Sequence, residues 1–320
     1  MRDKLTTLLK IVISLGLITF ALARANLDEV AAQLSSARLE LVAAALALYV
    51  TAIAINGLKW QVLLRAQGVQ VPLTAVLRFL FVGFFFNNFL PANVGGDVMR
   101  GYGLARYTDR NADAAVSVIV DRIVGLTAYL STAVVAAIVA VNLTGHTELR
   151  QVEWVAILAL AGLTAGFSVL LSRRLRALIT RAFAWRWLNP LAPLWERVST
   201  AFNAYRFRYG ALASAFGIAL FGILCTTFVN WFLSQAMGGH MSLPAIFLFN
   251  PLIALVLMIP ISIGGIGVSQ TAYPFFFGLA GVPADHALAV SLLIYAVAVV
   301  ASLPGGVLWL KGREKREEKG

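Results

Sequence analysis

Long apolar stretches alternate with short polar segments along most of this chain of 320 residues. The hydrocarbon core of a bilayer is about 30 Å thick, so a helix that crosses it needs about 20 mostly apolar residues. Six stretches approach or exceed this length, and they predict full spans at residues 5–23, 41–58, 113–141, 154–171, 210–236 and 286–310. The pattern therefore predicts an all-α polytopic membrane protein.

Two further apolar stretches carry the same interruption. Residues 90–96 and 259–265, which begin 169 positions apart, both read apolar-Pro-x-x-x-Gly-Gly. A proline removes a helix hydrogen bond and a glycine pair loosens the backbone, so each motif should break a helix. We expect re-entrant hairpins at 73–109 and 244–280, although two short crossing helices are the alternative. Matched broken segments in two halves of a membrane protein point to the substrate site of a transporter.

The chain divides into two predicted membrane halves, residues 1–172 and 210–310. Between them, residues 173–209 are rich in Arg, Trp and Pro and have no apolar run long enough to span. This segment predicts cytoplasmic amphipathic helices, and its tryptophans between 185 and 195 suit a membrane surface. Residues 311–320 are predicted to be a disordered cytoplasmic tail.

The distribution of basic residues supports this topology. The segments assigned to the cytoplasm are the N-terminus, residues 59–72, 97–112 and 173–209, and the C-terminal tail. Together they hold 20 of the 26 Lys and Arg residues, as the positive-inside rule requires. We therefore expect an integral protein of a prokaryotic cytoplasmic membrane, with both termini in the cytoplasm.

An odd number of full spans, three, separates the two hairpins. The hairpins would then open from opposite faces, which is the arrangement of an inverted repeat. Similar sequences begin the span after each hairpin: Asp113 and Asp285 each precede an apolar helix, 172 residues apart, where an acidic side chain caps free N–H groups. The alternative is coincidence, because small residues and helix caps are common in membrane proteins.

The composition agrees with a membrane protein. Hydrophobic residues make up 60% of the chain, charged residues 13%, and the mean hydropathy is +0.82. The net charge of +11 sets orientation here and does not indicate a nucleic-acid partner. Cys225 is the only cysteine, so no intrachain disulfide forms. The three histidines, His146, His240 and His286, have no ligand spacing, and we expect no metal and no other cofactor.

Five of the charged residues within or beside the predicted membrane segments are candidates for substrate contact: Arg78, Asp97, Arg100, Asp121 and Arg122. Charges at such depth usually face a cavity and pair with one another. The three arginines are candidates for a phosphate site, because a guanidinium binds phosphate oxygens bidentately. The alternative is that Asp97–Arg100 and Asp121–Arg122 are structural ion pairs near the cytoplasmic interface.

The residues at the two breaks are the other candidates for substrate contact. They are Asn87, Asn88, Pro91, Gly95 and Gly96 at the first break, and Pro260, Ser262, Gly264, Gly265, Ser269 and Gln270 at the second. Their polar groups either contact a headgroup or satisfy the hydrogen bonds of the broken backbone. No nucleophile or acid–base constellation is visible, so we do not expect an enzyme.

These motifs resemble a known family. Residues 86–100, which read Phe-Asn-Asn-Phe-Leu-Pro-Ala-Asn-Val-Gly-Gly-Asp-Val-Met-Arg, and Val120–Leu126 are similar to the lysylphosphatidylglycerol synthase transmembrane, or flippase-like, family. Residues 260–267 and 303–306 fit its C-terminal half. Members typically carry Arg-Glu after the second Gly-Gly-x-Gly, where this chain has Ser269-Gln270.

The resemblance implies a role in lipid movement. The best-known members of the family join this module to a soluble aminoacyl-transfer domain and flip its lipid product, and others are linked to glycolipid or polyprenyl-lipid pathways. We expect a stand-alone membrane module without the aminoacyl-transfer domain, so synthesis is not implied.

The leading hypothesis is a flippase or scramblase for a phosphate-bearing lipid: a phospholipid, an aminoacyl-phospholipid or a polyprenyl-linked lipid. Its expected partners are lipids with anionic or phosphate-bearing headgroups and a lipid-modifying synthase or glycosyltransferase. The alternatives are a secondary transporter of a small amphipathic or anionic solute and a non-catalytic membrane partner of a glycosyltransferase.

Overall fold

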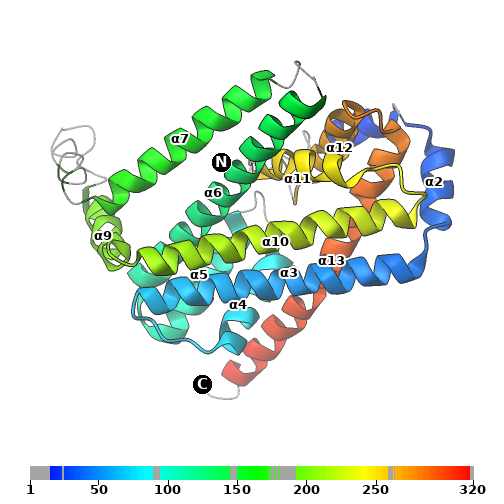
Figure 1. Ribbon diagram of the computed structural model, residues 1–320. Helices are drawn as coiled ribbons and strands as arrows, with labels where there is room; N and C mark the ends of the chain where they lie inside the picture. The colour runs from blue at the N-terminus through cyan, green and yellow to red at the C-terminus, as the bar shows by residue number, and fades with distance from the viewer. Residues whose placement is uncertain are drawn as a thin grey trace. The chain divides into compact units, whose positions relative to one another are not determined.

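The computed structural model describes residues 15–23, 25–88, 94–144, 150–172, 174, 177, 180, 192–258, 262 and 264–317. All regular secondary structure in these residues is helical. In chain order the helices are α2 (Leu27–Ser35), α3 (Leu39–Ala66), α4 (Leu73–Asn87), α5 (Val94–Thr108), α6 (Asn111–Thr144), α7 (Arg150–Leu171), α9 (Ala192–Phe202), the 3₁₀ turn η3 (Asn203–Tyr205), α10 (Tyr209–Ala236), α11 (Leu243–Met258), α12 (Val268–Gly278) and α13 (Ala284–Glu317) (Figure 1).

Four helices in the described part of the chain are long and apolar enough to cross a membrane. They are Leu39–Ala66, Asn111–Val139, Tyr209–Ala236 and Ala284–Lys311. Each has 28 or 29 residues, which is about 42 Å at 1.5 Å per residue and exceeds the hydrocarbon core. They agree with four of the six predicted spans. Of the other two, residues 5–23 are described only over the helical positions 15–23, and residues 154–171 lie within α7, so the number six stays a prediction.

Two pairs of shorter helices stand where the hairpins were predicted. α4 has 15 residues and α11 has 16, about 22–24 Å in length, which is less than the thickness of the core. A break separates α4 from α5 and α11 from α12, and each pair precedes a helix of 34 residues, α6 or α13, with an aspartate in its first turn. The repeat, its inversion and the re-entry of the hairpins stay predictions.

The described residues form two compact units, each of which draws on both predicted halves. The first unit contains the described residues up to Ala54, Leu77–Arg100, and those from Phe221 onward. The second contains Ile55–Val76 and the described residues from Gly101 to Leu220. In the first unit, α13 packs against α2 and α12, and α12 packs against α11. The predicted boundaries of the halves stay a prediction.

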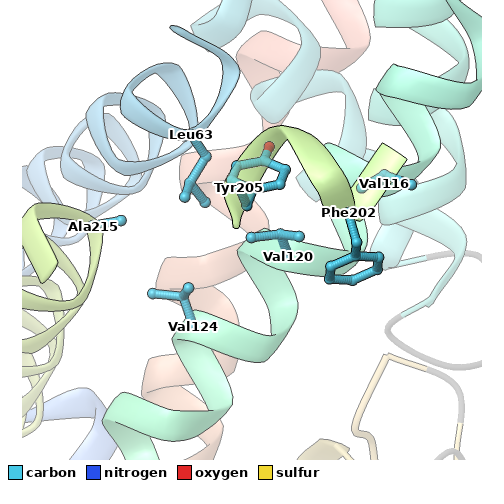
Figure 2. Packing of buried hydrophobic residues seen from close by; sticks show 7 residues of the cluster. All are labelled: Leu63, Val116, Val120, Val124, Phe202, Tyr205 and Ala215. Atoms are coloured by element: carbon cyan, nitrogen blue, oxygen red, sulfur yellow. The ribbon is translucent and has the colours of Figure 1, made fainter. Parts of the chain in front are cut away.

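The second unit has a buried apolar core in which α6 supplies one stripe. The core residues are Leu63, Val116, Val120, Val124, Phe202, Tyr205 and Ala215 (Figure 2). The three valines recur every four residues and therefore share one face of α6. Phe202 and Tyr205 belong to the segment predicted as surface helices. This segment is anchored at its C-terminal end, because both aromatic rings are fully buried.

Two helices continue beyond the bounds that the sequence predicts. Lys59 was placed in a cytoplasmic connection, but α3 continues to Ala66 and buries Lys59. Residues 311–317 were predicted to be disordered, but α13 continues to Glu317. Lys, Arg and Glu are good helix formers, so the charged end of the chain prolongs the helix.

Candidate functional site

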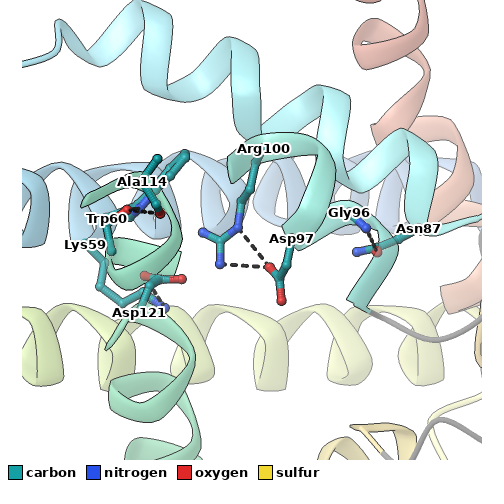
Figure 3. Close-up of polar contacts among 9 residues, drawn as sticks. Lys59, Trp60, Asn87, Gly96, Asp97, Arg100, Ala114 and Asp121 are labelled. Atoms are coloured by element: carbon teal, nitrogen blue, oxygen red, sulfur yellow. Dashed lines mark hydrogen bonds and ion pairs between the residues drawn. The ribbon is translucent and has the colours of Figure 1, made fainter. Parts of the chain in front are cut away.

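The first break is closed by a contact between α4 and the first turn of α5. The N–H of Gly96 donates to Oδ1 of Asn87 at 2.7 Å (Figure 3). Gly83 and Gly96 face each other so closely that a Cβ on Gly83 would lie 2.7 Å from the Gly96 carbonyl oxygen. Gly95 and Gly96 lie within α5, and neither has a positive φ. Glycine is therefore required at 96 for close approach and not for an unusual backbone conformation.

Arg100 follows this turn and is paired with Asp97. Its Nε and Nη2 both donate to Oδ1 of Asp97 at 2.8 Å (Figure 3). The side chains are 6% and 15% exposed, respectively, so the pair is largely removed from water. The i,i+3 spacing places both on one face of α5, as predicted. The charge of Arg100 is balanced by a carboxylate, so any anion that binds there meets a preformed ion pair.

The second break uses glycines differently. Gly264, Gly265 and Gly267 have φ of +59°, +78° and +83°, a region in which other residues are strained. The N–H of Gly267 donates to Oε1 of the buried Gln270 at 2.7 Å. Of the two roles left open for Gln270, the structure shows the second: its side chain satisfies the broken backbone. Ser269, the residue before Gln270, and Ser262 are also buried.

The two breaks meet in the first unit. A Cβ on Gly264 would lie 3.4 Å from the carbonyl oxygen of Asn88 and 3.6 Å from that of Asn87. The Nδ2 of Asn88 donates to Oγ of Ser302 in α13 at 2.7 Å. The end of α4 is thus in contact with α5, with the second break and with α13.

The sequence Pro-Gly-Gly at 304–306 explains how α13 approaches so closely. A Cβ on Gly305 would overlap the backbone carbonyl of Phe81, and one on Gly306 would lie 2.8 Å from the ring of Phe85. The helices therefore cross with backbone against backbone, which small residues permit in membrane proteins.

The other predicted site residues lie elsewhere or outside the described chain. Arg78 is exposed on α4, nine residues before Asn87, or about 13 Å along the helix. Arg122 is half-buried on α6 in the second unit. Pro91 and Pro260 are outside the described residues.

Asp121 forms an ion pair with Lys59, which is not among the predicted site residues. The Nζ of Lys59 lies 3.1 Å from Oδ1 of Asp121, and the side chains are 7% and 8% exposed (Figure 3). Nearby on the same two helices, Nε1 of Trp60 donates to Oγ of Ser117 at 3.2 Å. Lys59 is not among the predicted site residues because the predicted span ends at residue 58, directly before this charge. The apolar residues on both sides of Lys59 were the signal that the helix continues past it.

A buried polar network in the first unit was also missed. The hydroxyl of Tyr273 donates to Oδ1 of Asn230 at 2.6 Å, and Nδ2 of Asn230 donates to Oδ1 of Asn250 at 3.2 Å. The Nδ2 of Asn250 donates to Oγ1 of Thr227 at 3.3 Å. Thus α10, α11 and α12 are joined by side chains that satisfy one another, as buried amides must be.

Two of the three histidines lie side by side. The rings of His240 and His286 lie 4.8 Å apart, centre to centre. The buried His286 contacts Oγ of Ser234 at 2.9 Å and Oε1 of Gln33 at 3.1 Å. Within the described residues no group of three or more His, Cys, Asp or Glu is placed to hold a metal ion.

An apolar cavity of about 710 Å³ lies beside α12 in the first unit. Its walls are Leu17, Phe20, Ala21, Ala25, Val256, Val268, Gln270, Thr271, Ala272, Pro274, Phe275, Phe276, Ala284 and Leu288. Only Gln270 and Thr271 among these carry polar side chains, and Gln270 is the residue that caps the second break. The apolar cavity therefore extends to the second break.

The long apolar helices and the two broken pairs define an all-helical integral membrane protein. The chain belongs to the family described as the lysylphosphatidylglycerol synthase transmembrane region, whose sequence profile matches residues 7–305. It is similar to the UPF0104 membrane protein PH1989 of Pyrococcus horikoshii, with 24% identity over 326 aligned positions that cover 96% of this chain and 97% of the relative. No solved structure matches it.

Proposed function

We propose that the protein is a flippase or scramblase that moves a phosphate-bearing lipid across the membrane, with the headgroup passing between the two broken helix pairs. The acyl or polyprenyl tail stays in apolar surroundings, in the bilayer or in the apolar cavity beside α12. In this proposal the protein binds and moves its substrate and catalyses no covalent reaction. It lies in a prokaryotic cytoplasmic membrane with both termini in the cytoplasm.

The meeting of the two breaks is the observation that carries this proposal. Irregular backbone at membrane depth is tolerated only where protein or a polar cavity surrounds it. Here the polar backbone of both breaks is met by side chains, through Asn87 at Gly96 and through Gln270 at Gly267. Broken helices at such a junction are the usual substrate site of transporters with internal repeats.

The buried Asp97–Arg100 pair supports a phosphate-bearing headgroup. A guanidinium binds phosphate oxygens through parallel charge-assisted hydrogen bonds. Asp97 holds the side chain of Arg100 in place and compensates its charge in the unloaded protein, which reduces the cost of burying an arginine. Arg100 also stands one turn after Gly96, so the pair is adjacent to the first break.

The apolar cavity favours a lipid over a small polar solute. Twelve of its lining residues carry apolar side chains, and it reaches Gln270 at the second break. A hydrocarbon chain would be accommodated there at no desolvation cost, whereas a small anion would find no charged partner on these walls. The secondary-transporter hypothesis gains no comparable support.

Reconstitution tests the proposal. Purified protein in liposomes should transfer headgroup-labelled phospholipid between leaflets faster than protein-free liposomes do. The same vesicles should be tested with a neutral lipid of equal tail length, which should move more slowly. If small organic anions exchange across these vesicles while no labelled lipid moves, the protein is a solute transporter and the proposal is wrong.

A further inference from the structure

The Lys59–Asp121 pair lies in the membrane part of the second unit and has no role in the proposed headgroup site. Asp121 is ten residues into α6, about 15 Å from its start, and Lys59 is seven residues before the end of α3, about 10 Å. Both helices are long and apolar enough to span. Ionisable side chains in such helices are costly and usually serve function, often the movement of protons.

Adhesion between the two helices does not explain the pair. α3 and α6 are already joined by the Trp60–Ser117 hydrogen bond and by apolar contacts of Leu63 in the core. A buried ion pair is generally no more stabilising than two apolar residues of similar size, because each ion loses its hydration. A structural role would be served as well by a leucine and a methionine.

The ammonium group of Lys59 lies close to the backbone of α6. A Cβ on Gly125, one turn after Asp121, would lie 3.5 Å from Nζ of Lys59, an ordinary contact distance.

Polar side chains connect the N-terminal end of α6 with the region of the Lys59–Asp121 pair. Arg110 pairs with the partly exposed Asp113 at 2.6 Å, and Asp113 accepts from Nε2 of Gln67 at 3.1 Å. The hydroxyl of Tyr205 donates to Oε1 of Gln67 at 3.1 Å. Burial, together with the negative charges of Asp121 and Asp113, raises the pKa of Tyr205, so this hydroxyl stays protonated beside the pair.

Charged and titratable groups face Asp121 from several elements. Lys59 faces it from α3, Tyr205 approaches from η3, and Asp113 and Arg122 share α6 with it. The core side chains that α9 and α10 contribute here are apolar. Lys59 is the cation that pairs with this carboxylate.

We propose that the Lys59–Asp121 pair is a proton-binding site that couples lipid movement to a proton gradient. A proton from water adds to a carboxylate oxygen of Asp121 to give the neutral acid, with no electron transfer and no other bond broken. Lys59 keeps its charge, loses its counterion and must find another acceptor. That change separates α3 from α6 at this level. The coupling, though not the proton site itself, rests on the proposed function.

Two readouts test the site. Difference infrared spectroscopy on acidification should show a protonated carboxyl band that disappears in Asp121→Asn and persists in Glu40→Gln, which removes an exposed carboxylate from α3. In proteoliposomes, an inward and an outward pH gradient should change the rate of lipid transfer several-fold in opposite directions. The double variant Lys59→Met/Asp121→Leu removes both members of the ion pair and should transfer lipid at one rate whatever the gradient.

The outcomes separate the two proposals. If the wild type shows no Asp121-dependent band and its lipid transfer does not respond to the gradient, the proton site is wrong and the lipid function stands. The band without any lipid transfer supports the site and removes the lipid function. Gradient-sensitive transfer by the double variant also overturns the site, because the sensitivity would then arise elsewhere.

Discussion

Replacing Gly96 by alanine tests the contact that closes the first break. The added Cβ would overlap the carbonyl oxygen of Gly83 and lie 2.5 Å from Oδ1 of Asn87. The Asn87 side chain can move away, but it then loses its hydrogen bond from the Gly96 N–H; the Gly83 carbonyl is backbone and cannot rotate aside. Overpacking costs about 1–3 kcal/mol and a lost hydrogen bond about 0.5–1.5 kcal/mol.

Helix propensity acts in the opposite direction, because alanine is favoured over glycine in a helix by about 1 kcal/mol. The net expectation for Gly96→Ala is a destabilisation of about 1–3 kcal/mol. Gly101→Ala is the matched control on the same helix, since its Cβ would make only an ordinary contact at 3.5 Å with Val118. This control should be as stable as the wild type or slightly more stable.

The assay is the apparent Tm in detergent, measured beside the rate of lipid transfer in liposomes. Gly96→Ala should lower the Tm by several degrees and slow transfer, while Gly101→Ala should change neither. Equal stability of the two variants would show that α4 and α5 are not in backbone contact at Gly83 and Gly96. The packing of the first break would then be wrong.

Three further outcomes are expected. Gln270→Leu should destabilise the protein by about 1–3 kcal/mol, because the buried N–H of Gly267 loses its acceptor. Gln270→Glu keeps an acceptor and, at a pH low enough to protonate its buried carboxyl group, should have a higher Tm than Gln270→Leu; equal Tm values for both variants at that pH would rule out this cap. Arg100→Lys should stay folded, since an ammonium still faces Asp97, but should transfer phosphate-bearing lipid several-fold more slowly because it lacks the guanidinium fork; an unchanged rate would argue against a phosphate there. A cysteine at the exposed Glu196 of α9, in a background without the native cysteine, should be labelled by an impermeant thiol reagent only after the membrane is opened; labelling in intact cells would reverse the predicted topology.

Local patterns predicted the elements of the fold well. Uninterrupted apolar length identified α3, α6, α10 and α13, because the thickness of a bilayer sets that length directly. The Pro-x-x-x-Gly-Gly motifs marked both breaks. The role of each glycine was less visible, since Gly264 has a positive φ and Gly96 a close neighbour, and the two cases look alike in sequence.

Contacts between distant parts of the chain explain what was missed. Lys59 looked like the first residue of a polar connection, because its partner Asp121 is 62 positions away. Asn230 reads as an isolated polar residue in an apolar helix until Tyr273 is placed beside it. Only the packing of helices shows that such side chains satisfy one another, and spacing along the chain carries no information about that packing.

The central claim is that a lipid headgroup passes where the two breaks meet, which requires the end of α4 to separate from α13. Cysteines at Asn88 and Ser302, whose side chains lie 2.7 Å apart, can be joined by a short bifunctional methanethiosulfonate reagent in a Cys225→Ala background. Lipid transfer should fall to the rate of protein-free liposomes when the bridge is formed and recover when a thiol reductant opens it. Full bridging with an undiminished rate of transfer would contradict the claim.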